Sequence, residues 1–104
     1  MEVSNGMIWV TFWTLNPGVA PAKVAEVAGK LMQKGLYPPK DTKILGWYIC
    51  PGGKGVTISE SEAASGEVAF ENYVMWTKEL PEMFASYETF PAVSAEKAIS
   101  IVLK

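Results

Sequence analysis

Acidic and phenolic side chains are the residues in this sequence whose chemistry is closest to that of an active site. Glu88 follows Tyr87 in the segment 84–93, and Tyr48 lies in the segment 43–50. A carboxylate can act as a general base, and a tyrosine hydroxyl can donate a hydrogen bond to a reacting oxygen. Glu88, Tyr87 and Tyr48 are therefore the candidate catalytic residues. The alternative is that glutamates near strand ends point into water.

The four tryptophans form a second group of candidates, because indole rings can line an apolar binding pocket. They are Trp9, Trp13, Trp47 and Trp76. Such a pocket would lie either between a sheet and its helices or between two protomers, and it would take a small apolar or aromatic ligand. The alternative is that these rings only pack in the core or at an interface.

The composition excludes several kinds of chemistry. The 104 residues include no His, and all nine basic residues are Lys, so the chain has no Arg. Imidazole acid–base catalysis, His-containing metal sites and bidentate Arg clamps are therefore excluded. The net charge of −2 argues against nucleic acid as a partner. We expect no metal and no cofactor.

Two motifs that suggest chemistry have simpler interpretations. Cys50 is the single cysteine, and without an imidazole base a structural thiol at a strand end is favoured over a nucleophile. The glycine-rich run 52–55 (GGKG) joins two expected strands, whereas a phosphate-binding loop leads from a strand into a helix. This run therefore predicts the turn of an antiparallel hairpin.

Hydrophobic periodicity predicts one domain that spans residues 1–104 and contains four strands and three helices. The expected strands are 7–15, 43–50, 56–60 and 84–93. The expected helices run from Pro21 to Gly35, from Gly66 to about Leu80 before Pro81, and from Ser94 to the C-terminus, with Ser65 and Ser94 as caps of the second and third. The order βαββαβ is that of a ferredoxin-like α+β fold, in which both long helices cover one face of a four-stranded antiparallel sheet.

The first two expected strands are apolar on both faces. Strict alternation places Ile8, Val10 and Phe12 opposite Trp9 and Trp13. In the second strand it places Leu45, Trp47 and Ile49 on one face and Ile44, Tyr48 and Cys50 on the other. An uncovered apolar face of this size predicts a homodimer through the helix-free face, which is a dimeric α+β barrel. The alternative is a monomer whose C-terminal helix folds across the sheet.

Three segments resemble a family of short uncharacterised domains of the dimeric α+β-barrel, ferredoxin-like superfamily. They are 37–48 (YPPKDTKILGWY), 59–62 (SESE) and 87–93 (YETFPAV), and the resemblance covers roughly residues 7–99. That family often carries Gly-Arg-Trp-His after the prolines, where this chain has 46–49 (GWYI), so no role of that Arg or His carries over. The resemblance implies the fold and the dimer, and its broader group includes cofactor-free monooxygenases and small isomerases.

These observations together predict a small homodimeric protein that binds a small apolar or aromatic ligand. The alternative is a cofactor-independent monooxygenase- or isomerase-like enzyme that uses Glu88, Tyr87 or Tyr48. The apolar run 7–15 has no basic segment before it and is shorter than the roughly 20 residues of a membrane span. We therefore expect a cytoplasmic protein without a membrane partner.

Overall fold

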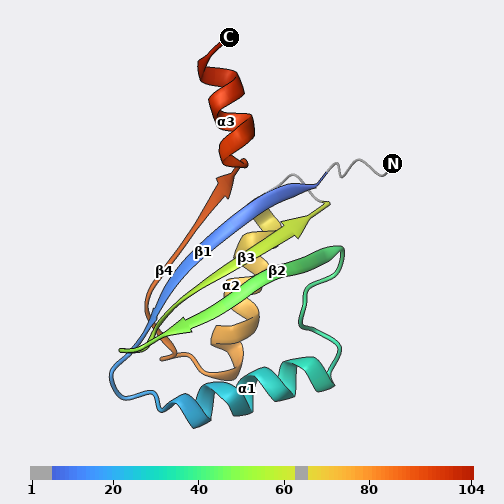
Figure 1. Ribbon diagram of the computed structural model, residues 1–104. Coiled ribbons are helices and arrows are strands. Elements are labelled where there is room, and N and C mark those ends of the chain that lie inside the picture. The colour runs from blue at the N-terminus through green and yellow to red at the C-terminus, as the bar shows by residue number, and fades with distance from the viewer. Residues whose placement is uncertain (1–5, 63–65) are drawn as a thin grey trace.

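The computed structural model describes residues 6–62 and 66–104, in which four strands and three helices alternate as predicted (Figure 1). In chain order they are β1 (Met7–Leu15), α1 (Pro21–Gln33), β2 (Thr42–Cys50), β3 (Lys54–Ser61), α2 (Gly66–Glu79), β4 (Phe84–Ala92) and α3 (Ala95–Val102). The predicted cap Ser65 lies outside the described residues. The cap at Ser94 is confirmed, because its side chain accepts a hydrogen bond from the backbone N–H of Lys97 at 3.1 Å.

The four strands form one antiparallel sheet in the order β2-β3-β1-β4. This order is the ferredoxin-like arrangement that the alternation of strands and helices predicts. The run 52–55 lies in the β2–β3 hairpin as expected, where Gly52 and Gly53 have φ angles of 88° and 76°. Such positive φ angles favour glycine and explain the composition of the turn.

Helices α1 and α2 cover one face of the sheet. Their buried side chains form the core, with Val27 and Leu31 from α1 and Trp76 from α2. Leu15 and Trp47, which lie on strands, pack against this core. The apolar stripe of α1 therefore faces the sheet, as the amphipathic pattern of this helix predicts.

The expected alternation of β2 is wrong in its first half because the strand contains a β-bulge. Ile44 pairs with Ser59 and Gly46 pairs with Ile58, so Leu45 is an extra residue. An extra residue changes the side to which the preceding side chains point. Ile44 therefore joins Trp47 on the helix-covered face, while the side chain of Leu45 is 47% exposed.

The other face of the sheet has no helix over it. The Phe12 and Phe90 rings lie on this face with centroids 6.3 Å apart, and they are 50% and 49% exposed. Helix α3 extends beyond the end of the sheet instead of folding across it (Figure 1), and none of its residues is buried. The structure therefore does not have the alternative arrangement, in which the C-terminal helix covers the sheet. None of the described helices has the length and apolar character needed to cross a membrane.

Candidate functional site

The helix-covered face of the sheet combines aromatic rings with hydroxyl groups. Strand pairing aligns two neighbouring rows of residues across β2, β3, β1 and β4. The first row is Trp47, Thr57, Thr11 and Thr89, and the second is Ile49, Gly55, Trp13 and Tyr87. Because residues two apart on a strand share a face, these rows lie side by side beneath the helices.

Three neighbouring hollows, which share lining residues, lie between the sheet and the helices. The two inner hollows have volumes of about 30 Å³ each and share Thr11, Tyr37, Thr57, Asn72 and Tyr87 in their linings. The outer hollow has a volume of about 390 Å³ and shares Trp9, Tyr87 and Thr89 with its inner neighbour. A volume of about 10–15 Å³ admits one water, so the inner hollows fit solvent-sized groups and the outer one fits larger groups.

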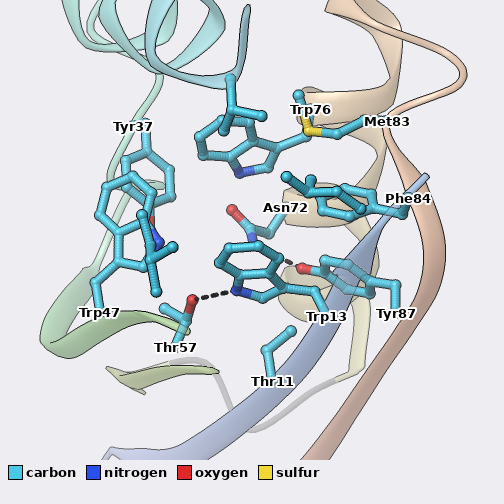
Figure 2. A pocket seen from close by; sticks show the side chains of 13 residues that line it. Thr11, Trp13, Tyr37, Trp47, Thr57, Asn72, Trp76, Met83, Phe84 and Tyr87 are labelled. Carbon is cyan, nitrogen blue, oxygen red and sulfur yellow. Dashed lines mark hydrogen bonds between the residues drawn. The ribbon is translucent and has the colours of Figure 1, made fainter. Parts of the chain in front are cut away.

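Hydrogen bonds connect the polar groups of the inner hollows (Figure 2). The Asn72 amide Nδ2 donates to the Tyr87 hydroxyl at 2.8 Å, and the Trp13 indole Nε1 donates to Thr57 Oγ1 at 3.2 Å. The hydroxyls of Thr11 and Thr89 are 3.0 Å apart across β1 and β4. Helix α2 and strand β4 are therefore joined through a polar contact inside the molecule.

Two buried polar atoms in this region have no hydrogen-bond partner among the described residues. They are the indole Nε1 of Trp9 and the amide oxygen Oδ1 of Asn72. Leaving a buried donor or acceptor unpaired costs about 1–3 kcal/mol, and such groups are few in folded proteins. One free donor and one free acceptor therefore line the hollows.

Aromatic rings form the walls on either side of Asn72. On one side the centroid of Tyr37 lies 5.3 Å from those of Trp47 and Trp76, which are 6.0 Å from each other. On the other side the Tyr87 ring lies 4.9 Å from the Phe84 ring. Figure 2 shows Asn72 between these two groups, with Trp13 beside it.

The hollows are uncharged, since the described residues that line them include no Asp, Glu, Lys or Arg. Burial raises the pKa of Tyr37 to about 12, with a smaller contribution from Tyr87. Burial also raises the pKa of the Tyr87 hydroxyl, against the opposing effect of its hydrogen bonds with Asn72, Thr89 and Thr11. Both hydroxyls are thus neutral at pH 7 and act as hydrogen-bonding groups rather than bases.

The four candidate tryptophans all border these hollows. Trp13, Trp47 and Trp76 line one inner hollow, and Trp9 lines the other inner hollow and the outer one. Gly55 makes room for Trp13, since a Cβ atom at this position would overlap the indole ring.

The structure does not bring the three candidate catalytic residues together. Tyr87 lines all three hollows, whereas Glu88 pairs with Phe12 and is exposed. Tyr48 pairs with Val56 and is 60% exposed. The reason is the period of two along a strand, which turns Glu88 and Tyr48 to the helix-free face. Glu88 therefore does not line the hollows that Tyr87 borders.

The residue that the sequence analysis missed is Asn72. It lies four residues before Trp76 on α2, within the otherwise apolar side of that helix. A polar residue at such a position is unusual enough to indicate a specific role. Thr11 is likewise a polar residue in apolar surroundings, because it lies between Trp9 and Trp13 on one face of β1.

Metal binding finds no support in this region. Within residues 6–62 and 66–104, no three His, Cys, Asp or Glu side chains form a group that could hold an ion. Cys50 lies at the end of β2, pairs with Lys54 and is exposed.

The chain resembles several solved structures over most of its length. A hypothetical protein from Arabidopsis thaliana has a TM-score of 0.59 at 16% identity, covering 91% of this chain and 93% of its own. A NIPSNAP family protein of unknown function from Agrobacterium tumefaciens has a TM-score of 0.56 at 17% identity, covering 88% and 89%. A candidate antibiotic biosynthesis monooxygenase from Bacteroides thetaiotaomicron has a TM-score of 0.50 at 13% identity, covering 88% and 90%.

This chain has a ferredoxin-like α+β fold and shares it with these structures. At identities below 20% the likeness shows the fold alone, because one fold carries many functions. No protein-family model and no curated protein matches the sequence. The fold implied by the resemblance of segments 37–48, 59–62 and 87–93 is confirmed.

Proposed function

We propose that the protein is a homodimer in which each protomer binds a small, uncharged aromatic molecule between its sheet and α2. The observation that carries this proposal is a set of charge-free, aromatic-walled hollows that contain an unpaired donor on Trp9 and an unpaired acceptor on Asn72. Binding sites for small molecules commonly combine apolar walls with a few polar groups of this kind.

In this proposal each hollow holds a different part of the ligand, according to its volume. The outer hollow, bordered by Trp9, Phe70 and Tyr73, has the volume for a ring system. The inner hollows take only a polar substituent or a water, beside Asn72. A carboxylate would lose its hydration here without gaining a cation, so the proposal specifies a neutral ligand.

The homodimer is supported by the apolar helix-free face. Phe12, Leu45, Tyr48 and Phe90 are each about half exposed or more on the described chain. Monomeric proteins seldom leave such a group of apolar residues in water. A second copy of the same face is the simplest cover because a two-fold axis makes a surface complementary to itself.

Titration of tryptophan fluorescence with 2-naphthol and 2-naphthoate tests the binding proposal. We expect 2-naphthol to change the emission saturably, and the carboxylate to have no effect at the same concentrations. Asn72→Leu should weaken binding of the phenol at least tenfold, because it removes the unpaired buried oxygen, while the lost hydrogen bond to Tyr87 should lower stability by about 0.5–1.5 kcal/mol. Tyr48→Leu, on the opposite face, is the matched control and should bind like the unchanged chain. Equal binding by Asn72→Leu and the control would contradict the assignment.

A cofactor-independent monooxygenase is the second candidate, and the Tyr87–Asn72 pair is the observation that favours it. These groups can orient a hydroxylated aromatic substrate, and a protein of this fold from Bacteroides thetaiotaomicron is named as a candidate monooxygenase. Oxygen uptake in the presence of 2-naphthol tests this candidate, and we expect Tyr87→Phe to reduce it while Glu88→Gln does not. An isomerase would need a base beside the substrate, and Glu88 points to the other face.

A further inference from the structure

Helix α3 has an apolar stripe that residues 6–62 and 66–104 leave exposed. The stripe consists of Ala95, Ala98, Ile99 and Val102, which share one side because they are three and four residues apart. No residue of α3 is buried, and Ile99 and Val102 are 58% and 79% exposed. Figure 1 shows α3 beyond the end of the sheet, away from α1 and α2.

A helix of this length needs a tertiary contact. It has eight residues, whereas isolated helices shorter than about 12–15 residues are marginal in water even when their composition is favourable. The Ser94 cap and Glu96 in the first turn help its start, but each such group contributes little by itself. Something outside the described chain must therefore cover the stripe.

The position of α3 indicates what that cover is. Phe90 lies on the helix-free face and is 49% exposed, and its strand ends at Ala92, three residues before α3 begins at Ala95. The chain therefore passes directly from the face that we propose to be covered by a second copy into this helix.

The area of the sheet face points to the same occupant. Four strands of about nine residues span roughly 30 by 19 Å, which is about 570 Å² of projected face. A stable interface usually buries about 800 Å² of accessible surface on each partner, and the stripe on α3 adds to the apolar surface that a second copy can bury.

We propose that α3 is an arm that packs its apolar stripe against the second copy of this chain. This inference rests on the homodimer of the proposed function and adds a segment that was not assigned to it. In such a dimer each protomer holds the other through its C-terminal helix as well as through its sheet.

Two isoleucines on α3 provide a matched test. Ile99 and Ile101 are almost equally exposed, at 58% and 55%, but they lie about 200° apart around the helix. In sedimentation velocity over a wide range of concentrations, we expect Ile99→Ser to raise the dimer dissociation constant by about tenfold or more. Ile101→Ser should change it by less than about twofold. Circular dichroism of each variant at high concentration checks that the sheet is intact.

The possible results separate this inference from the homodimer itself. A dimer that Ile99→Ser and Ile101→Ser weaken equally, or not at all, overturns the arm and leaves the sheet-face dimer standing. A chain that stays monomeric at all concentrations overturns both.

A spin label on α3 gives a second readout of the arm. The label is attached to the single thiol of a double variant, Ser100→Cys with Cys50→Ser, and this chain is mixed with an isotope-enriched copy that carries no label. We expect the label to broaden amide signals of the enriched copy. Amide signals of the enriched copy that stay sharp under conditions where the chain is dimeric would overturn the arm.

Discussion

The two faces of the sheet have similar hydrophobicity but different chemistry. The helix-covered face alternates tryptophans with threonines, as in Trp9, Thr11 and Trp13. The helix-free face carries Ile8, Val10 and Phe12 from the same strand, with no polar group between them. The first face therefore leaves hydrogen-bonding groups inside hollows, and the second presents a surface suited to another protein surface. The comparison separates a candidate ligand site from a candidate interface.

Removing a ring from the helix-covered face should have the largest effect. Trp76 is 6% exposed and packs against Tyr37 and Trp47. Trp76→Ala is therefore expected to lower the free energy of unfolding by about 3–5 kcal/mol, through lost burial and the cavity that remains. Urea unfolding monitored by circular dichroism measures this change. A loss below about 1 kcal/mol would mean that this wall of the site does not belong to the core.

Ionisation of Tyr37 should destabilise the same face at high pH. Burial raises its pKa to about 12, above the value of about 10 in an unfolded chain. The unfolded state then loses its proton first, so stability is fully present below pH 10 and falls as the pH rises towards 12. We expect a loss of about 2 kcal/mol between pH 9.5 and 12. Tyr37→Phe should flatten this part of the profile, and an equally steep profile for that variant would assign the effect to other groups.

Filling the space under Trp13 should lower the free energy of unfolding by a somewhat smaller amount. A Cβ at Gly55 would overlap the Trp13 ring, so Gly55→Ala must displace the indole and disturb its hydrogen bond to Thr57. Overpacking of this kind costs about 1–3 kcal/mol. Gly29→Ala on α1 is the control, because a Cβ there meets no atom within 4 Å. This control should be neutral or stabilising by up to about 1 kcal/mol, and a Gly55→Ala chain of equal stability would show that the ring can move freely.

A polar residue on the helix-free face should have the smallest effect on the protomer and a clear effect on its association. Phe12 is 50% exposed, so Phe12→Ser should change the unfolding of a dilute protomer by less than about 1 kcal/mol. Burial in a dimer makes the melting temperature depend on protein concentration. We expect that dependence in the unchanged chain and its loss in Phe12→Ser. Identical concentration dependence in both would show that this face is not the interface.

Much of the fold followed from local patterns. The apolar run 7–15 and the helical spacing after Pro21 correctly predict β1 and α1, because propensity, patterning and capping agree there. The run 52–55 predicts the hairpin because it is rich in glycine, and Gly52 and Gly53 do occupy positive φ angles. The candidate site was less predictable, because Asn72 lies on α2 and Tyr87 lies on β4. These residues are 15 positions apart in the sequence and form their hydrogen bond only in the folded chain.

The sequence by itself determined the order of strands and helices, the apolar character of both strand faces and the absence of imidazole and guanidinium chemistry. It left Glu88, Tyr87 and Tyr48 together as candidate catalytic residues. Only the tertiary structure decided that Tyr87 faces the helices, that the bulge at Leu45 brings Ile44 and Trp47 to one side, and that Asn72 lies over the threonine row. The physical reason is that register and bulges arise from pairing between distant segments, and no local pattern encodes that pairing.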